Sequence, residues 1–446
     1  MAEKFYAKGP GNEGYIKNME VVGYHDLSGV MAFQTQLYKT TEGRYYLYTG
    51  SMKGISFGIL DVTDPANPVE VNRVNCLDPA KYTYASTPKL QICDDLMIIA
   101  LGNGFPMLHG PFPKDGFEPL GPLQIYSLKE DPVHPKLLSS WDAGAYPGGV
   151  HRFCYNGERY VHLSCTCDGY TGMIYRILDI QDPANPVEVG RWCMDHQYRG
   201  SKTQAELDAI DESFCGVHCV YVLDNKAYLS CMKHGFYIVD VSDVRHPQTL
   251  GHLDMCPPFG GKESGARCHT FLPIIGTSFA VGTHEGERFF CMSEEKLSSG
   301  AQPLNSIITI DISDPTDPVM VADFPYPEVP AGFPYRNFNF CGLPKQGPFG
   351  PHNLHEPMTN KPWIENRKDR IYNCYFHAGM RVYDFSDPYV PKEIAYFIPP
   401  NPLKPTYEVE TPGPLLGSGE DCVVDDRGYI FMDTTFDGLY VLKCLV

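Results

Sequence analysis

Short runs of alternating apolar and polar residues follow one another along the whole chain, and a turn motif closes many of them. In "FGILDVTDPANPVEVNRV", residues 57–74, an apolar run ends at Asp61 and a second alternating run begins after Pro68. Such alternation predicts strands with one face towards a core. In the Asp-Pro-x-x-Pro motif between them, proline presets φ and the aspartate side chain accepts hydrogen bonds from the following amides. The pattern therefore predicts a strand, a tight turn and a second strand.

This unit recurs, and the recurrence predicts the architecture. Copies occupy residues 175–192, 236–253, 307–324 and 380–397, a weaker copy occupies 123–141, and a truncated copy occupies 438–444. Two more strand-like runs precede each copy, so a unit has four strands, which is typical of a propeller blade. With the truncated copy included the chain has seven copies, and these predict an all-β fold. We expect a seven-bladed β-propeller of four-stranded blades that spans residues 1–446 as a single domain.

The truncated copy lacks its outer strand, and the other end of the chain offers one. Residues 18–26, "NMEVVGYHD", resemble residues 185–195, "NPVEVGRWCMD". We therefore expect an N-terminal strand at about residues 17–26 to complete the C-terminal blade. This pairing closes the ring without leaving an exposed sheet edge.

The repeats resemble a known family. Ile-Leu-Asp-Val at 59–62, Ile-Val-Asp-Val at 238–241 and Ile-Thr-Ile-Asp at 308–311 stand at the head of these turns. They are similar to the repeats of the LVIVD-repeat β-propeller proteins, and the similarity extends over nearly the whole chain. The resemblance implies the propeller fold but no single activity, so the function has to be argued from the site.

Histidine recurs where the first strand of a blade begins, which is the strand that lines the central channel. Four consecutive predicted blades place His151, His218, His269 and either His352 or His355 at this position. His352 and His355 would face opposite ways in a strand. We expect only one of them to be a channel ligand, and favour His352.

A second set of histidines lies near the end of the second strands. It comprises His234, His284 and His377. The loops that follow second strands lie on the same face as the start of the first strands, so both sets are expected to converge at one mouth of the channel. Packing of a core does not require imidazole at the same place in successive blades.

Several inward-facing imidazoles are typical of a metal site. We expect His151, His218, His269 and His352 to hold a divalent transition metal, with Fe or Cu favoured and Zn or Mn as alternatives. His234, His284 and His377 are candidates for further ligands or acid–base groups, and Glu420 or Asp421 for a base or an orienting carboxylate. The arrangement also has a looser architectural parallel in carotenoid-cleaving oxygenases and in selenium-binding protein/methanethiol oxidase, although no sequence motif of either is present.

Four long segments are expected to lie over the same mouth. They cover about residues 104–121, 193–215, 285–305 and 325–350, and the last is rich in aromatic residues, Gly and Pro. Long loops over a propeller mouth often form a binding pocket. An aromatic cover favours a small organic substrate with a hydrophobic or ring-bearing body.

Charge and composition narrow the partners and the compartment. A formal charge of -18 repels phosphate backbones and anionic lipid, so neither nucleic acid nor a membrane is an expected partner. The N-terminus lacks the features of a signal peptide, and 16 cysteines are therefore interpreted as mostly reduced in a cytoplasmic protein.

Three functions remain open from the sequence. A metal-dependent enzyme that oxidises or oxygenates a small organic molecule is ranked first, because imidazole ligands suit redox metals. A metal-dependent lyase, isomerase or hydrolase at the same site is the second hypothesis. The third is a non-catalytic propeller scaffold that binds a protein partner. The sequence does not indicate the oligomeric state.

Overall fold

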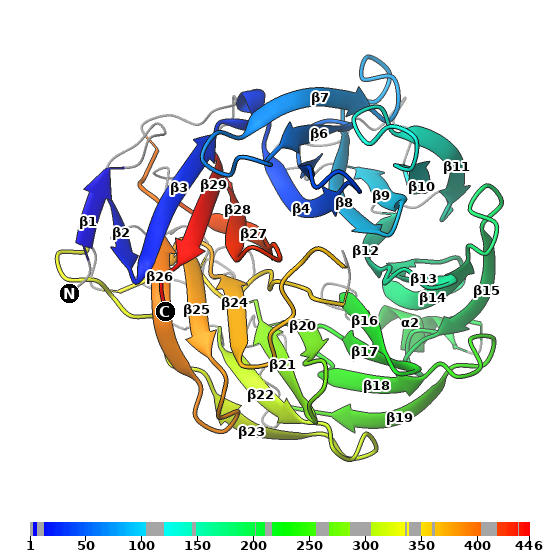
Figure 1. The fold of residues 1–446 in the computed structure, drawn as a ribbon. Coiled ribbons are helices and arrows are strands. Elements are labelled where there is room, and N and C mark those ends of the chain that lie inside the picture. Colours follow the sequence, from blue (N-terminus) through cyan, green and yellow to red (C-terminus); the bar gives the residue numbers. More distant parts are fainter. Residues whose placement is uncertain are drawn as a thin grey trace.

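The computed structural model is a ring of β-sheets around a central axis (Figure 1). The structure describes residues 3–6, 13–103, 120–144, 149–200, 202–209, 216–255, 267–285, 305–334, 337–338, 349–358, 362–402, 417–435 and 437–446. The predicted cover segments at 104–121 and 285–305 lie almost entirely outside these residues, and those at 193–215 and 325–350 lie partly outside them.

Four sheets have four strands each, as the sequence predicts for a blade. Their strand orders are β12-β13-β14-β15, β16-β17-β18-β19, β20-β21-β22-β23 and β27-β28-β29-β3. The strands are β12 (Val150–Cys154), β13 (Tyr160–Thr166), β14 (Met173–Asp179), β15 (Val187–Trp192), β16 (Cys219–Leu223), β17 (Lys226–Ser230), β18 (Phe236–Asp240), β19 (Gln248–Leu253), β20 (Cys268–Pro273), β21 (Phe279–His284), β22 (Ile307–Asp311), β23 (Val319–Asp323), β27 (Gly419–Val424), β28 (Tyr429–Thr434), β29 (Gly438–Cys444) and β3 (Met19–His25).

Two larger sheets complete the ring. One has eight strands, because a single residue pair, Ser51 with Thr87, joins β4–β7 to β8–β11. The other has five strands in the order β1-β2-β26-β25-β24. The strands are β4 (Ala32–Lys39), β5 (Tyr45–Ser51), β6 (Ser56–Asp61), β7 (Val69–Asn75), β8 (Ala85–Cys93), β9 (Leu96–Asn103), β10 (Pro122–Ser127), β11 (Lys136–Asp142), β1 (Glu3–Tyr6), β2 (Glu13–Lys17), β24 (Arg370–Cys374), β25 (Met380–Asp384) and β26 (Lys392–Ile398).

The N-terminal segment adds strands to two sheets that are formed by the C-terminal part of the chain. The predicted pairing of residues 17–26 with the C-terminal sheet is confirmed, because β3 runs antiparallel to β29, with Tyr24 opposite Tyr440. A second pairing is not predicted from the sequence: β2 extends the preceding sheet through β26, with Ile16 opposite Phe397. The first and last parts of the chain are therefore held by main-chain hydrogen bonds in two neighbouring sheets.

The Asp-Pro turns adopt the conformation that the sequence predicts. Asp64 accepts a hydrogen bond from the Ala66 amide at 3.1 Å, and the Asn67 amide group donates to the same carboxylate at 2.7 Å. In the equivalent turn His134 takes the place of asparagine, with its Nδ1 2.8 Å from the Asp131 carboxylate. This histidine therefore stabilises a turn.

A β-bulge in the outer strands β15 and β19 brings a glycine against the turn of the next sheet. The pairing of β14 with β15 shifts after Ile177–Gly190, and a Cβ at Gly190 would lie 1.8 Å from the Val244 carbonyl oxygen. Gly251 is equivalent, and its Cβ would lie 2.2 Å from the Pro315 carbonyl oxygen. Glycine is required here because another main chain passes so closely.

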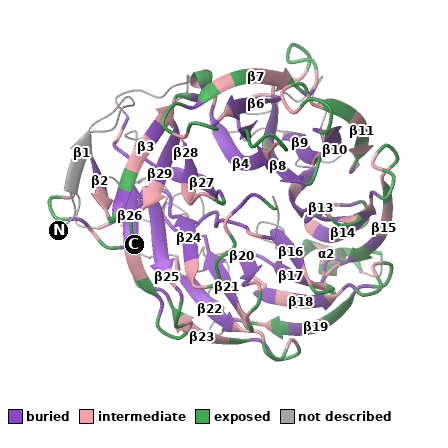
Figure 2. Cartoon of the chain, viewed as in Figure 1, coloured by how far each residue is buried: buried purple, intermediate pink, exposed green. Residues whose placement is uncertain are grey.

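Apolar side chains fill the space between neighbouring sheets. Phe236 of β18 and Phe271 of β20 are fully buried, with ring centroids 5.2 Å apart. The inner strands are buried along their length, whereas β7, β11, β15 and β19 expose much of their surface (Figure 2). The inner strands thus form a rigid wall around the axis.

Helices contribute little to the described chain. They are the single-turn η1 (Leu27–Gly29) and α2 (Gln204–Asp208), which Thr203 caps at its N-terminus. Within the described ranges, no helix is both long and apolar enough to cross a bilayer.

The contact between an outer strand and the next turn predicts the effect of one substitution. We expect Gly190→Ala to lower the free energy of unfolding by about 1–3 kcal/mol, because the added methyl group overlaps a main-chain carbonyl. Equilibrium urea unfolding measures this change. Val187→Ala on the same strand is the control, since Val187 is 57% exposed and its truncation should change stability by less than about 0.5 kcal/mol. Equal stabilities of the two variants would contradict the account.

Candidate functional site

The inner strands β4, β8, β12, β20 and β27 each begin with a β-bulge. Val150 pairs with Cys165 and Arg152 pairs with Ser164, so His151 is the extra, unpaired residue. His269 and Glu420 occupy the same position in β20 and β27. A bulge breaks the alternation of a strand and changes the direction of its side chains.

Because of the bulge, two consecutive side chains face the axis. His151 Nε2 lies 2.8 Å from His218 Nε2, while the next residue, Arg152, lies 3.5 Å from the Glu356 carboxylate and also donates to Asn353. The axis therefore carries two tiers, with histidines in one and ion-paired groups in the other.

Lys89 belongs to the second tier. It is the first paired residue after its bulge, opposite Ala100, as Arg152 and Asp421 are after theirs. Lys89 therefore lies one position beyond the place in the strand that His151, His269 and Glu420 occupy.

Four histidines form a continuous row. His151 and His269 lie at the bulges of β12 and β20, His218 directly precedes β16, and His352 lies in the segment that pairs with β24. Neighbouring ring centroids are 4.5 Å apart for His151 and His218, 4.2 Å for His218 and His269, and 4.9 Å for His269 and His352. We call these four residues the histidine row. The first predicted set is thus brought together, from four neighbouring sheets.

Hydrogen bonds fix which nitrogen of each ring is available. Nδ1 of His218 donates to the His269 carbonyl at 2.9 Å, and Nδ1 of His352 donates to the Glu420 carbonyl at 2.8 Å. Nδ1 of His269 lies 2.8 Å from the Thr270 hydroxyl. A neutral ring that donates through Nδ1 carries its lone pair on Nε2, which is the arrangement of metal-binding histidines.

The rings of the row are neutral. Burial and then the nearby positive charges of Lys89, Arg152 and Arg267 hold the pKa of His151 and of His352 well below the usual range. Burial dominates for His218 and His269 too, and the pKa of each is further lowered by a neighbouring histidine. All four can therefore act as neutral ligands.

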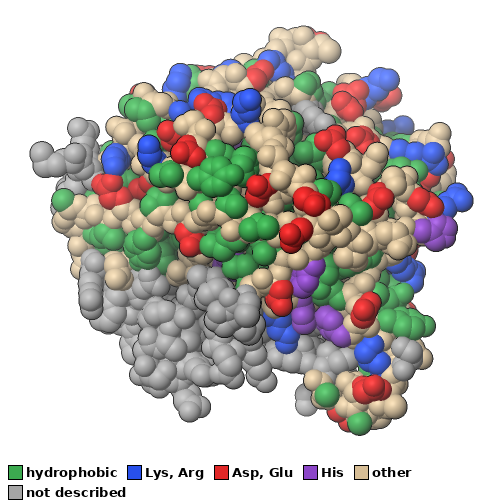
Figure 3. All heavy atoms as spheres, turned by 90° about the horizontal axis from the view of Figure 1, so that it is seen from below, with side chains coloured by type: hydrophobic (Ala, Val, Ile, Leu, Met, Phe, Trp, Pro, Cys, Tyr) green, Lys and Arg blue, Asp and Glu red, His purple; other side chains and the backbone are tan. Residues whose placement is uncertain are grey.

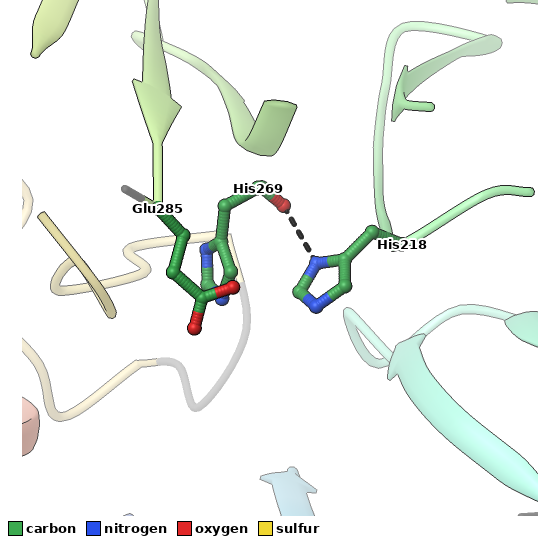
Figure 4. A group of neighbouring side chains, drawn as sticks. All are labelled: His218, His269 and Glu285. Carbon is green, nitrogen blue, oxygen red and sulfur yellow. Dashed lines mark hydrogen bonds between the residues drawn. The ribbon is translucent and has the colours of Figure 1, made fainter. Parts of the chain in front are cut away.

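A carboxylate completes the group. Ligand atoms of His218, His269 and Glu285 all lie within 4.8 Å of one another (Figure 4). Atoms that share one ion at a bond length of about 2.1 Å are at most about 4.2 Å apart, so an inward shift of under about 1 Å is enough. Glu285 also lies 3.7 Å from His352 Nε2, which connects it to the rest of the row.

The predicted acid–base carboxyls lie beside the row. The Glu420 carboxylate is 3.5 Å from His352 Nδ1 and accepts a hydrogen bond from Thr435. Burial raises the pKa of Glu420 to about 7. Burial and then repulsion from Glu356 raise the pKa of Asp421 to about 7 as well. Both carboxyl groups therefore gain and lose a proton near neutral pH, where general acid–base catalysis is effective.

His355 is committed elsewhere. Its Nε2 donates to the Glu365 carbonyl at 2.7 Å, and its Nδ1 accepts from the Val424 amide at 3.2 Å. His352 is thus the member of the pair that lies in the row, as the sequence favoured.

The second predicted set does not share one position, which corrects the sequence alignment. In one turn the Cys231 amide donates to Gly235, and in the equivalent turn the Tyr375 amide donates to Gly379, both at 2.8 Å. Counted from these bonds, His234 and His377 are displaced from each other by one residue. His284 is earlier still, because it is the last residue of β21 and pairs with Cys268.

These three side chains contact other parts of the molecule. The ring of His234 lies 4.3 Å from His196, in the segment that follows β15. The ring of His377 lies 5.5 Å from Phe349. His284 packs edge-on against Phe236 at 5.7 Å, between two sheets. The structure therefore does not bring His234, His284 and His377 onto the histidine row.

Sequence reasoning missed the charged second tier. Glu356 accepts from the Tyr221 hydroxyl at 2.5 Å and lies 3.4 Å from the Gln91 amide nitrogen, in addition to its contact with Arg152. These residues are buried. Their polar types within or beside the inner strands are a signal in the sequence, but in a strictly alternating strand the residue after an axis-facing histidine points away from the axis.

The fold and this central site define the chain as a β-propeller protein. The LVIVD repeat family model matches residues 46–76, 217–254 and 301–324, which confirms the resemblance inferred from the sequence. The chain carries LVIVD repeats. No curated protein matches it in sequence.

Solved structures support the fold alone. The β-propeller domain of Cps50 (Swd1) from Myceliophteria thermophila is 8% identical, with a TM-score of 0.51, and the match covers 97% of this chain and 100% of that one. The computationally designed Ika8 protein has a TM-score of 0.45 at 9% identity, over 94% and 98% of the two chains. Raptor from Chaetomium thermophilum has a TM-score of 0.48 at 10% identity, over 94% of this chain and 29% of that one.

The surroundings of His284 predict how stability depends on pH. Within the described part of the chain neither ring nitrogen has a hydrogen-bond partner, and burial lowers the pKa of His284 from 6.5 to about 4. Between these values the unfolded chain binds a proton that the folded chain does not, so folding weakens as the pH falls.

We expect His284→Leu to be more stable than the parent protein, by a margin that grows by about 2 kcal/mol between pH 7 and pH 5. Urea unfolding at the two pH values checks this. Phe236→Leu alters the same contact without a titrating group, so its effect should not change with pH. If His284→Leu exceeds the parent protein in stability by the same amount at both pH values, the account of His284 as a buried, neutral packing residue is contradicted.

Proposed function

We propose that this protein is a metal-dependent enzyme that acts on a small organic molecule at the histidine row. Oxidation or oxygenation of a substrate with a hydrophobic or aromatic body is the reaction we favour. A metal-dependent lyase, isomerase or hydrolase at the same site is the alternative. The observation that carries the proposal is the hydrogen bonding of the Nδ1 atoms of His218 and His352, which puts the lone pair of each neutral ring on Nε2, the atom that would bind a metal.

The donor set supports iron as the metal. His218, His269 and Glu285 supply two imidazoles and one carboxylate from rigid strands and their ends. This combination is typical of non-haem iron(II) oxygenases, in which the ion binds and activates dioxygen. His151 and His352 lie next to these residues and are further candidate ligands. Copper, zinc and manganese remain alternatives.

Acid–base groups support catalysis in addition to binding. Glu420 lies beside His352, and its carboxyl group has a pKa of about 7. We assign it the role of moving a proton to or from the substrate. Asp421, in the tier below, is held by the Thr35 amide at 3.0 Å and has a similarly raised pKa. It is the second candidate for this role.

We also propose that the ring has seven blades. The eight-stranded sheet divides at its one joining pair, Ser51 with Thr87, into two four-stranded units. With the other five sheets this gives seven units, in agreement with the repeats.

We also propose that the protein works in a reducing, cytoplasmic compartment. The described cysteines are free thiols and most are buried, which supports this compartment.

Metal analysis tests the proposal. We expect the protein, purified without a metal-affinity tag and reconstituted anaerobically with iron(II), to hold about one equivalent of metal per chain. His218→Ala and His269→Ala should each lower the bound metal at least about tenfold, because each removes a ligand of a three-residue group. His134→Ala is the matched control, since His134 stabilises an exposed turn and should leave binding unchanged.

The identity of the metal and its absence are both informative. Iron or copper in the purified protein supports redox chemistry, and zinc supports the lyase or hydrolase alternative. A parent protein that takes up no metal after reconstitution would contradict the proposal and favour the protein-binding scaffold. So would uptake that survives loss of both His218 and His269.

A further inference from the structure

Three histidines outside the histidine row lie together at the surface. His196 follows β15, His234 lies in the turn between β17 and β18, and His252 lies in β19. The first two are half-buried and the third is exposed. On the face seen in Figure 3, histidine side chains gather at one place beside acidic and basic groups. We call His196, His234 and His252 the surface histidine cluster.

Two rings of the surface histidine cluster lie against each other. The ring centroids of His196 and His234 are 4.3 Å apart, and the ring planes are inclined by 37°. Neighbouring rings of the row have the same spacing, as the distances of 4.2 Å and 4.9 Å on either side of His269 show. Because imidazole nitrogen binds zinc at about 2.0–2.1 Å, a small rotation of each ring would bring one nitrogen of each to a shared ion.

Hydrogen bonds hold the main chain beside His196. The next residue, Gln197, is fully buried. Its amide group donates to the carbonyls of Thr171 and Met173 at 3.0 Å and 2.8 Å. The segment after β15 is therefore fixed where it carries His196 to the surface.

The turn that carries His234 is fixed as well. The His234 amide donates to the Cys231 carbonyl at 2.8 Å, and the His234 carbonyl accepts from His252 Nε2 at 2.7 Å. The His252 ring itself stacks on Tyr237, with centroids 3.9 Å apart and planes inclined by 17°. His252 therefore positions the turn, and His196 and His234 are the two candidate ligands. Ligands held in this way lose little freedom when an ion binds.

The surroundings favour neutral rings and supply negative charge. Burial and then the charge of His196 lower the pKa of His234 to about 4, and burial is also the main cause of the lowered pKa of His196. Asp195 and Asp254 lie close enough to act on these two pKa values in the opposite direction. Neutral imidazole is the form that binds a metal, and the two carboxylates offset part of the charge of an ion.

We infer that His196 and His234 form a second metal site, which binds one zinc(II) or copper(II) ion at the surface and is separate from the row. Each ring supplies one nitrogen, and water fills the remaining positions because the pair reaches the surface. Imidazole suits both metals, and the general order of affinity places copper(II) well above iron(II). The ion would join the segment after β15 to a turn of the neighbouring sheet. The inference does not depend on the proposed function, because it uses no residue of the row.

Chromatography on immobilised copper(II) tests this site. Copper(II) held by iminodiacetate keeps open positions that only surface side chains reach, whereas His218 and His269 of the row are at most 4% exposed. We expect the protein without a tag to be retained. His196→Ala and His234→Ala should each elute at an imidazole concentration at least about fivefold lower, because each removes one of two ligands. His246→Ala is the matched control, since His246 is exposed in a turn of the same sheet and pairs with Asp243.

Chemical modification checks the site on the parent protein, without a variant. Diethyl pyrocarbonate acylates accessible neutral imidazole, and peptide mass spectrometry follows each histidine separately. We expect zinc(II) to slow the modification of His196 and His234 at least about tenfold, because a nitrogen bound to the ion has no lone pair left to react. The modification of His246 should not change.

The outcomes separate this site from the row. A parent protein that is not retained, or that is retained equally after loss of His196 and of His234, overturns the inference. So does zinc(II) that protects neither residue. His218→Ala, which tests the proposed function, should leave retention unchanged, and a loss of retention in that variant would contradict two separate sites.

Discussion

The site depends above all on one backbone constraint, the β-bulge at the start of β12, β20 and β27. In a regular strand His151 and Arg152 would point to opposite faces, and so would Glu420 and Asp421. The bulge turns both members of each pair towards the axis. It thereby creates a tier of imidazoles next to a tier of charged groups. Burial keeps the rings of the upper tier neutral, and the charges of Lys89 and Arg152 in the lower tier lower the pKa of His151 and His352 further.

The rest of the ring keeps these positions fixed. Small residues in the outer strands admit the turn of the next sheet, as Gly190 and Gly251 do. The N-terminal strands tie the first and last parts of the chain together through β3 and β2. A row whose histidines come from four neighbouring sheets needs such a scaffold, because a shift of about 1 Å between sheets would separate the rings.

The sequence predicts the parts of this structure that local chemistry determines. Alternation and the Asp-Pro turns were sufficient for the sheets, and the likeness of residues 18–26 to 185–195 was sufficient for the pairing of β3 with β29. Histidines at strand starts led to the row, because His151 and His269 occupy the bulges of β12 and β20 and His218 directly precedes β16 between them. The pairing of β2 with β26 could not be predicted, since it depends on where the chain passes after folding.

The error in the second histidine set has a physical cause, which is that a displacement of one residue changes the environment of a side chain. His234 and His377 look equivalent by distance from the second strand, but the hydrogen bonds of their turns place them one residue apart. Arg152 shows the same sensitivity, because in a strand without the bulge it would point away from the channel, and a bulge leaves no reliable mark in a single sequence. Which side chains face the channel can be predicted only where the position of the bulge is known.

The central claim is that the Nε2 atoms of the row and the Glu285 carboxylate share one ion. The most direct measurement is an anomalous difference map, at the iron edge, from crystals reconstituted anaerobically with iron(II). The account predicts one peak within about 2.0–2.3 Å of Nε2 of His218 and His269 and of an oxygen of Glu285. Density for these residues without a peak between them, or a peak bound elsewhere on the chain, would contradict it.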